Sequence, residues 1–253
     1  SYGHHLFTIF RHFVELCAIT LSNAADPINK AAREAQYLAI VKYYKPEEFQ
    51  QFPPMLGMLV ECLEHESTDV LGTLYHRLEI HNEQSGQFFT PYSVSVAMAK
   101  MLVHDAKHLV EARGFIRAHE PCVGSGSMVL ALAQALREEG INYQQHLHVM
   151  AIDLDIIAVH MAYVQCTLLH IPAVIVHGDT LRDETYSIWR TFAHTLGFWD
   201  AKLARDHRTL PTPEEASPME HTAPTPEVLT PSLPAAPIPA PPINAPSSQL
   251  SLF

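Results

Sequence analysis

The residues best suited to chemistry follow three short apolar segments in the middle of the chain. EPCVGSGSM (120–128) comes after the first segment, and its Gly124 and Gly126 allow a sharp turn and a close approach of the backbone to a ligand. The second segment ends at Asp153, whose carboxylate could accept hydrogen bonds from both hydroxyls of a ribose. The third ends at Asp179, which could accept a hydrogen bond from the amino group of an adenine. Together these residues predict a site for a nucleotide-like ligand.

Each of these signals also has a purely structural interpretation. The glycine segment could be a tight turn into a helix capped by Ser127, Asp153 could cap the next helix, and Asp179 could be a turn residue. The three positions nevertheless fall at successive strand ends, and ligands of open α/β sheets lie in the crevice outside those ends. We therefore favour one ligand site over three separate turns.

Three apolar runs are expected to be the strands that position these residues. They are GFIRAHEP (114–121), HVMAIDL (148–154) and AVIVHGD (173–179), and their composition is typical of buried parallel strands. The segments between them have helical patterns, at residues 127–140, closed by Gly140, and 156–170, stopped by Pro172. Strand, helix, strand, helix and strand in this order predict one half of a doubly wound, Rossmann-like sheet.

The first 82 residues are expected to form a helical region in front of this sheet. Apolar residues at helical spacing predict helices at residues 4–22, 28–44, 52–65 and 68–82. Asp26 is a suitable cap and Pro27 a suitable first residue for the second helix, and Thr68 is a suitable cap for the fourth.

GQFFTP (86–91) precedes another segment with a helical pattern, YSVSVAMAKMLV (92–103). Pro91 fits the first position of that helix, and Thr90 fits its cap. From the residues alone, this segment is only the entry to a helix.

Composition narrows the class of protein. With 253 residues and 47% hydrophobic content, the chain can bury a sizeable core. Its formal net charge of −11 argues against a generally basic, nucleic-acid-coating surface, although a local basic patch could exist. Four scattered Cys without a Cys-x-x-Cys pair disfavour structural zinc and disulfides, and no metal site is expected. The apolar N-terminal stretch is too short and too charged to span a membrane, and we expect a cytoplasmic protein.

The last part of the chain has a different composition. Twelve of the 19 Pro residues lie between positions 211 and 246, among Ala, Thr and Ser, which predicts a disordered, semi-rigid linker. The expected organisation is therefore a helical N-terminal region at residues 1–82 and a partial Rossmann-like sheet domain at 83–205. A Pro-rich linker at 206–248 and a short apolar terminus at 249–253 follow.

Four segments together resemble the N6-adenine DNA methyltransferases, and in particular the modification subunits of type I restriction systems. They are DVLGTLYHRLEIHNEQSGQFFTP, EPCVGSGSM, AIDLD and HGDTL, in that order over residues 68–181. The resemblance implies an S-adenosylmethionine (SAM) site in a Rossmann-like domain. The residues it assigns to that site are Phe89, Thr90 and Pro91 along the pocket, Glu120, Gly124 and Gly126 at the methionine part, Asp153 at the ribose and Asp179 at the adenine.

One part of the family pattern is missing. In that family an Asn-Pro-Pro motif followed by Phe or Tyr ends a fourth strand, where it binds the target amino group and stacks on the flipped adenine. The sequence after Asp179 is RDETYSIWRTFAHTLGFWD, which holds no such motif, and we assign no catalytic residue. We expect Trp189 and Trp199 to pack against the sheet rather than to stack on a base. The first strand would then be a sheet edge unless other elements or a partner chain cover it.

The terminus QLSLF (249–253) resembles the short peptide by which bacterial replication and repair proteins bind the β sliding clamp of DNA polymerase. The resemblance implies that Gln249 enters a polar pocket while Leu250, Leu252 and Phe253 fill an apolar cleft. About 40 residues of Pro-rich chain could reach on the order of 100 Å, which would keep the folded part near clamp-bound DNA. A stray apolar terminus is the alternative interpretation.

Three functions are compatible with these observations. The first is a SAM-binding, methyltransferase-like protein without a complete catalytic centre, which contacts DNA weakly or indirectly near the bacterial nucleoid. The second is an active N6-adenine methyltransferase that a partner chain or a divergent motif completes. The third is a degenerate scaffold that binds no SAM. We favour the first, because the motif and the second half of the sheet are both missing.

Overall fold

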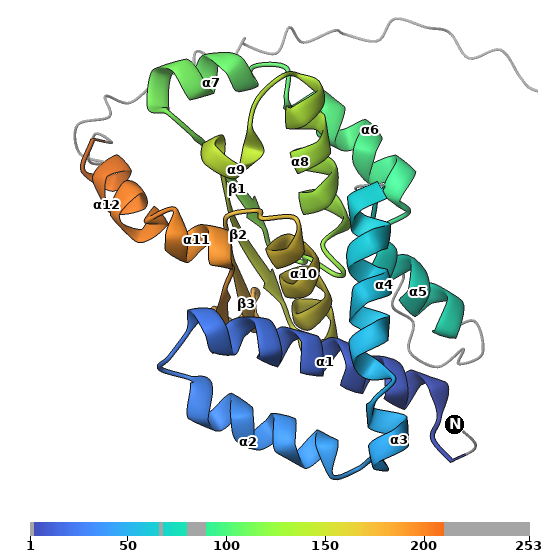
Figure 1. Ribbon diagram of the computed structural model, residues 1–253. Helices are drawn as coiled ribbons and strands as arrows, with labels where there is room; N and C mark the ends of the chain where they lie inside the picture. Colours follow the sequence, from blue (N-terminus) through green and yellow to red (C-terminus); the bar gives the residue numbers. More distant parts are fainter. Residues whose placement is uncertain (1–2, 66–67, 80–89, 210–253) are drawn as a thin grey trace, which may run out of the picture. The chain divides into compact units, whose positions relative to one another are not determined.

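A four-stranded sheet lies among helices in the described part of the chain, which comprises residues 3–65, 68–79 and 90–209 of a computed structural model (Figure 1). Its strands are β1 (Ile116–Glu120), β2 (Leu147–Asp153), β3 (Ala173–Asp179) and β4 (Glu184–Arg190), in that spatial order. The first three are parallel, and β4 runs antiparallel to β3. The predicted α/β class and partial Rossmann-like sheet are confirmed, whereas β4 was not predicted.

Helices precede the sheet and connect its strands. The helices before β1 are α1 (Leu6–Ala25), α2 (Lys30–Val41), α3 (Pro46–Phe49), α4 (Phe52–His65), α5 (Val70–Glu79), α6 (Tyr92–Leu102) and α7 (Ala106–Arg113). The later ones are α8 (Ser127–Glu138), α9 (Tyr143–His146), α10 (Ile156–Leu168), α11 (Phe192–Leu196) and α12 (Trp199–Thr209). The predicted helical N-terminal region and both crossover helices are confirmed, while α3, α7, α9, α11 and α12 were not foreseen. None of these helices is both long and apolar enough to cross a bilayer.

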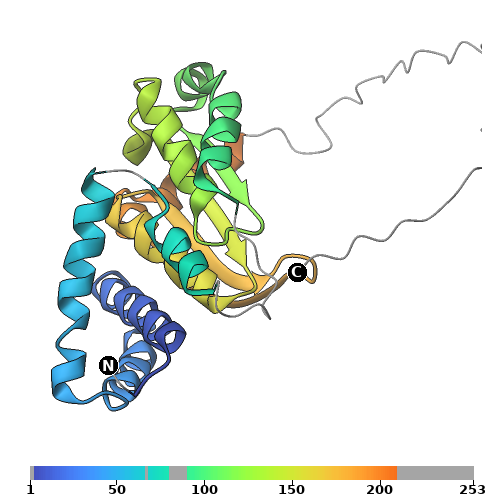
Figure 2. The same cartoon turned by 90° about the vertical axis from the view of Figure 1, so that its right-hand side faces the viewer.

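The crossover helix α10 forms the centre of the core. All ten residues from Ala158 to Thr167 are buried, because α10 packs on β2 and β3 on one side and against α1 on the other (Figures 1 and 2). A helix that is buried all round has no polar face, which matches the apolar run in its sequence. The N-terminal helices therefore supply the layer that covers α10.

Arg33 on α2 connects the N-terminal helices to β4. The Arg33 guanidinium donates to Asp26 Oδ2 and to the carbonyl of Ile188, each at 2.9 Å, and lies 3.9 Å from the ring centroid of Trp189. Trp189 itself is buried beside Ile175 of β3. The free-energy cost of burying the Arg33 guanidinium is offset by its contacts with the carboxylate of Asp26, the carbonyl of Ile188 and the ring of Trp189.

The two tryptophans pack as expected. Trp189 belongs to the core of the sheet, and Trp199, at the start of α12, is only 1% exposed. Its ring meets Phe115 just before β1 and His148 on β2, with centroids 5.2 Å apart in each case. The segment after β3 therefore covers part of the second face of the sheet.

Two predicted helix starts in the N-terminal region were wrong. Asp26 ends α1 and holds the turn, accepting from the amides of Ile28 and Asn29, so α2 begins only at Lys30. Asp69, not Thr68, caps α5, because its Oδ1 accepts from the amide of Gly72 at 2.9 Å.

Two further predicted caps were also wrong. Pro91 has an extended backbone and occupies the cap position itself, so α6 begins at Tyr92 and Thr90 lies outside it. Gly126 occupies the cap position of α8 with a φ of 99°, which Ser127 would not adopt readily. Ser127 is instead the first helical residue.

The described residues all belong to one unit, Ser1–Leu210. Phe89, residues 210–248 of the predicted Pro-rich linker and the predicted clamp peptide lie outside the described residues. Residues 206–209 of that predicted linker are helical, because α12 continues to Thr209 across the predicted boundary at residue 205. The domain boundaries at residues 82 and 248 stay predictions.

Candidate functional site

The glycine segment forms a tight turn from β1 into α8. Gly124 and Gly126 have φ values of 55° and 99°, which side chains disfavour. A Cβ on Gly126 would also lie 3.2 Å from Leu130 Cδ1 and 3.3 Å from Ala162 Cα, so the turn fits closely between α8 and α10. The first amides of α8 are thereby presented at the carboxyl end of β1, where they can interact with electron-rich groups.

Asp153 connects this turn to the end of β2. Its Oδ2 accepts from the amide of Gly124 at 2.8 Å, and its Oδ1 accepts from the amide of Asp155 at 2.9 Å. The alternative role as a helix cap is excluded, because Asp155 caps α10 by accepting from the amide of Ile157. A carboxylate has about four acceptor positions, so the half-buried Asp153 keeps capacity for two hydroxyl donors.

The end of β3 adjoins the same loop. Thr180 donates from its hydroxyl to the carbonyl of Pro121 at 2.7 Å, which joins the turns after β3 and β1. Asp179 accepts from the amides of Leu181 and Arg182 at 2.9 and 3.2 Å. It therefore has the alternative role of a turn residue, and its proposed contact with an adenine stays a prediction.

Glu120, the last residue of β1, is partly buried and turned onto its own loop. Its Oε1 accepts from the amide of Cys122 at 3.2 Å. Cys122 is exposed and unpaired with another cysteine. Both residues lie at the mouth of the glycine turn, so a ligand held there would be close to each of them.

The FTP segment reaches the beginning of α8. The carbonyl of Thr90 accepts from the Ser127 hydroxyl at 3.5 Å, and that hydroxyl also bonds the buried hydroxyl of Ser95 on α6 at 2.8 Å. Thr90 and Pro91 are exposed. The structure thus brings Thr90, Pro91 and the glycine turn together, although they are separated by about thirty residues.

A buried polar network behind the glycine turn was not foreseen. The Ser125 hydroxyl donates to Asp69 Oδ2, and Gln165 of α10 donates to Asp69 Oδ1 at 2.9 Å and to the carbonyl of Ser125 at 2.8 Å. All three side chains are at most 3% exposed. In the sequence, Asp69 is recognisable only as an acidic residue before an apolar run, which is a signal for a helix cap. That signal does not reveal its contacts with Ser125 and Gln165. This network fixes the glycine turn against α5 and α10.

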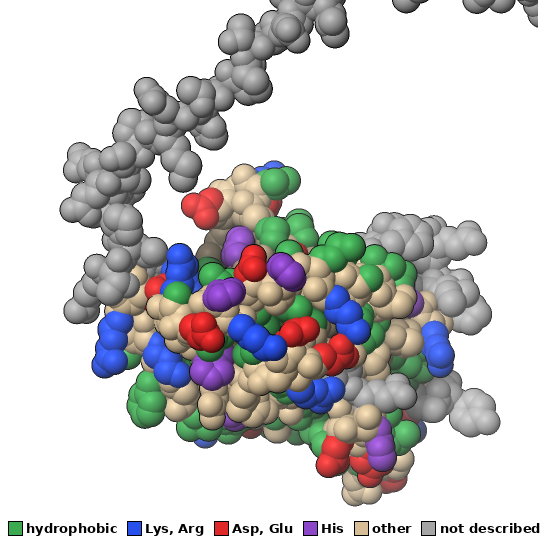
Figure 3. Space-filling model, turned by 90° about the horizontal axis from the view of Figure 1, so that it is seen from above, with side chains coloured by type: hydrophobic (Ala, Val, Ile, Leu, Met, Phe, Trp, Pro, Cys, Tyr) green, Lys and Arg blue, Asp and Glu red, His purple; other side chains and the backbone are tan. Residues whose placement is uncertain are grey.

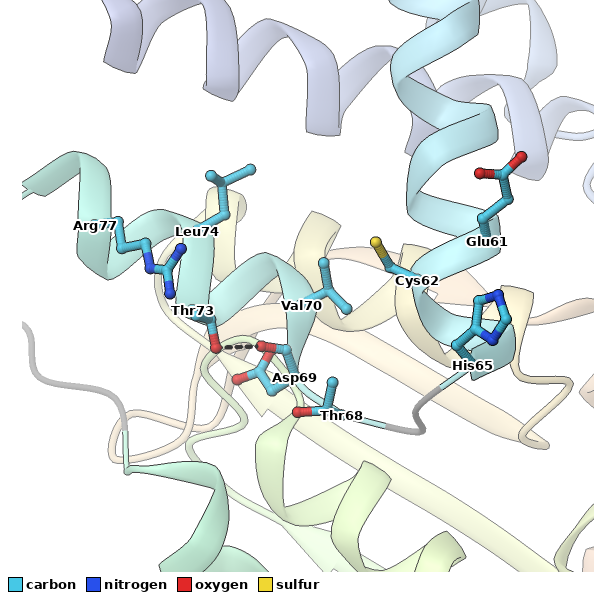
Figure 4. Close-up of a pocket in the computed structure, with 9 residues that line it drawn as sticks. All are labelled: Glu61, Cys62, His65, Thr68, Asp69, Val70, Thr73, Leu74 and Arg77. Carbon is cyan, nitrogen blue, oxygen red and sulfur yellow. Dashed lines mark hydrogen bonds between the residues drawn. The ribbon is translucent and has the colours of Figure 1, made fainter.

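A groove of about 580 Å³ lies between α4 and α5, on the opposite side of Asp69 from the glycine turn. Figure 4 shows Asp69 and Thr73 at the α5 wall, with Cys62 on α4 pointing toward α5 and His65 one turn further along α4. The groove is larger than the other hollows described below, but it lies behind the glycine turn. The groups that could hold a nucleotide converge instead at the strand ends, so we place the candidate site there.

Charges on the face above α7 and α8 are mixed. Figure 3 shows basic, acidic and histidine side chains interspersed on this face rather than gathered into a stripe. Lys100 pairs with Glu138 at 2.9 Å and Lys107 with Glu139 at 3.3 Å, which ties α6 and α7 to the end of α8. This face therefore offers little unpaired positive charge to a polyanion.

Comparison with known proteins gives two matches. The family described as N-6 DNA Methylase matches residues 66–197, which are 132 of the 253 residues. The crystal structure of a Listeria monocytogenes protein, described as a candidate class I S-adenosylmethionine-dependent methyltransferase, matches at 13% identity with a TM-score of 0.33. The match covers 66% of this chain and 46% of that one, so this chain spans less than half of the other's length. No curated protein matches the chain.

Proposed function

We propose that this chain, which belongs to the N-6 DNA methylase family, binds SAM at the carboxyl ends of β1, β2 and β3. The observation that carries the proposal is the position of Asp153, whose two oxygens accept from the amides of Gly124 and Asp155. A carboxylate held in this way is oriented toward the strand ends and has acceptor capacity left for a ribose. The alternative, a scaffold that binds no SAM, predicts that SAM does not stabilise the chain.

The residues present fit the chemical parts of SAM. In this proposal the turn at Gly124 and Gly126 receives the methionine part, Asp153 accepts from the ribose hydroxyls, and Asp179 accepts from the adenine amino group. Glu120 and Thr90 line the approach, with Phe89 and Pro91 assigned to the same pocket by the family resemblance. SAM, when bound, supplies an electrophilic methyl group on sulfur.

We further propose that the chain does not by itself carry a complete catalytic centre. Its 253 residues contain no Asn-Pro-Pro motif. The strand that follows β3 is β4, which runs antiparallel to β3 at the opposite edge of the sheet from β1. Its end therefore does not lie beside the glycine turn. A parallel strand next to β1 would end beside that turn. A target base would need groups that hold its amino nitrogen and stack on its ring.

SAM binding is tested by isothermal titration calorimetry and thermal unfolding. The wild-type chain should bind SAM and gain thermal stability from it, because a ligand that binds only the folded state stabilises it by mass action. Asp153→Ala should abolish both effects, whereas Asp105→Ala, which removes an exposed carboxylate on the far side of α6, should change neither. Equal SAM binding by wild type and Asp153→Ala would refute the placement of the site.

One observation favours a second function, an active N6-adenine methyltransferase completed by a partner chain. Among the described residues β1 pairs with β2 alone, so its other edge can accept a strand. The test is the N6-methyladenine content of DNA from bacteria that lack their own adenine methylases and express this chain. Methylation above background would support the active enzyme, and its appearance only with a co-expressed neighbouring gene would identify the partner.

The tail supplies a separate proposal about location. We propose that Gln249, Leu250, Leu252 and Phe253 bind the bacterial β sliding clamp and hold the folded part near replicating DNA in the cytoplasm. Tethering of this kind raises local concentration without a basic DNA-binding face. Such a tether would help this chain to stay near DNA, because its net charge is −11 and Lys100 and Lys107 are already paired with Glu138 and Glu139.

A further inference from the structure

A second hollow lies on the opposite side of Asp153 from the glycine turn. It has a volume of about 440 Å³ and is formed by α1, α2, the start of α10 and the adjoining parts of β3 and β4. His177 on its wall is the register partner of Asp153 in the sheet, and Ile156 begins α10 just after Asp153. Its volume falls in the range of small-molecule sites, which is roughly 300–1,000 Å³.

Aromatic rings make up much of the wall. His177 on β3 and Tyr186 on β4 meet edge to face with centroids 5.1 Å apart, and His160 and Trp189 meet edge to face at 4.7 Å. Tyr186 is half-exposed, so part of its ring is accessible from the hollow. Rings at such a wall offer flat surfaces on which a planar heterocycle can stack.

The charges of the wall exclude an anionic ligand. Arg33 is already paired with Asp26 at 2.9 Å and bound to the carbonyl of Ile188. Glu15, also on the wall, adds a carboxylate, and burial raises its pKa while Arg11 opposes that shift. The hollow therefore has no surplus positive charge for a phosphate, and a neutral ligand fits it better.

One buried polar atom on the wall lacks a partner. His160 is 5% exposed, and its Nε2 has no hydrogen-bond partner among the described residues. Buried polar groups are almost always hydrogen-bonded, so such an atom calls for an explanation. The exposed amides of Asn29 and Gln36 line the same hollow and can supply donors and acceptors to an incoming polar edge.

We propose that the hollow between α1, α2, α10 and the β3–β4 edge is a binding site for a neutral nucleobase. The ring stacks on Tyr186 or His177, and its polar edge is read by Gln36, Asn29 and Glu15. This site is separate from the glycine turn, and it does not depend on SAM binding there. Its occupant is the base of a free nucleoside, because the adenine of SAM is assigned above to Asp179, which does not line this hollow.

The test is a calorimetric titration of the full chain, saturated with SAM so that the glycine-turn site is filled, with adenosine and with inorganic phosphate as the second probe. Adenosine should bind and phosphate should not. Gln36→Trp, which fills the hollow from an exposed helical position, should abolish adenosine binding, while Gln145→Trp on α9 should not. Tyr186→Ala should weaken it roughly tenfold, the loss of one stacked ring. Tyr43→Ala, with 52% exposure against 50% for Tyr186, is the matched control.

Two results would overturn the proposal. Adenosine binding to the SAM-saturated chain that survives both Gln36→Trp and Tyr186→Ala places the nucleoside elsewhere, and so does a failure of the SAM-saturated wild-type chain to bind adenosine. Asp153→Ala distinguishes this site from the glycine turn, because it should lose SAM binding and keep the adenosine binding that Gln36→Trp abolishes.

Discussion

The amide of Gly124 donates a 2.8 Å hydrogen bond to Oδ2 of Asp153, so the glycine turn after β1 and the end of β2 are held together by a side chain. Oδ1 of the same carboxylate accepts from Asp155. Both oxygens are therefore acceptors in the folded chain even before any ligand binds. This arrangement gives Asp153 a structural role in addition to the binding role proposed above.

Asp153→Asn should consequently destabilise the chain in the absence of SAM. The amide group has the shape of the carboxylate, but its NH2 must face a backbone N–H on one side, which leaves a donor without a partner. We expect a loss of about 1–2 kcal/mol in the free energy of unfolding, measured by urea denaturation. A stability equal to that of wild type would show that the two amide contacts contribute little.

The contact between Gly72 and the buried Asp69 network leads to a sharper prediction. A Cβ at Gly72 would overlap Asp69 Oδ2 and Ser125 Oγ, both of which are fixed in the network. Gly72→Ala should therefore lower the free energy of unfolding by roughly 1–3 kcal/mol, as overpacking does. Gly57 in α4 is the matched control, because a Cβ there meets nothing within 4 Å. Gly57→Ala should stabilise the chain by up to about 1 kcal/mol.

These polar contacts also mark the limit of what the sequence predicts. The strands β2 and β3 and the helices α8 and α10 could be predicted within a few residues, because their apolar patterns are local. The network of Asp69, Ser125 and Gln165 could not, because its members are far apart in the chain and only the fold brings them together. The residues at the strand ends could thus be predicted from the sequence, whereas the buried side chains that hold the glycine turn in place could not.

The strand β4 was missed for a related reason. Glu184–Arg190 is largely exposed in its first half and has no buried apolar alternation, so its pattern is weak. It is held by its antiparallel pairing with β3 and by the long-range hydrogen bond from Arg33 to the carbonyl of Ile188. Asp183, with a φ of 56°, turns the chain back along β3, and the sequence gives no glycine to signal that turn.

Acid should destabilise the fold through His148. Its Nε2 lies 3.0 Å from His194 Nδ1, and His194 Nε2 lies 3.2 Å from Asp200 Oδ1. Because a carboxylate only accepts, His194 donates to Asp200 and accepts from His148, and both rings are neutral. Burial, with His194 and Arg117 nearby and Asp200 opposing, lowers the pKa of His148 from 6.5 to about 4.

The unfolded chain, in which His148 has its ordinary pKa, binds the proton first as the pH falls. Stability is therefore lost between about pH 6.5 and pH 4, and a single site of this kind contributes a loss of about 2 kcal/mol from pH 7 to pH 5. Urea unfolding of His148→Phe should show a smaller difference between those two pH values than wild type. An identical difference would mean that the protonation of His148 does not control acid stability.

The apolar terminus gives a prediction that is independent of the fold. Replacing Leu252 and Phe253 together by Ala should abolish binding of the full chain to a purified bacterial β clamp, because these side chains supply most of the apolar area of the peptide. Replacing Val228 and Leu229, which lie in the same Pro-rich tail, should leave binding unchanged. Clamp binding by the Leu252/Phe253 variant, measured by surface plasmon resonance, would contradict the assignment.

Cysteine reactivity can report on the glycine turn directly. Cys62 and Cys122 are exposed, whereas Cys17 and Cys166 are buried, and burial raises the pKa of each of the latter thiols to about 12. The native chain should therefore react with a thiol reagent at Cys62 and Cys122, and at all four sites in urea. Because Cys122 lies at the mouth of the proposed SAM site, saturating SAM should slow its modification and leave that of Cys62 unchanged. Mass spectrometry of the labelled peptides measures both rates, and equal slowing at the two sites would point to a general stabilisation instead of a ligand bound at the turn.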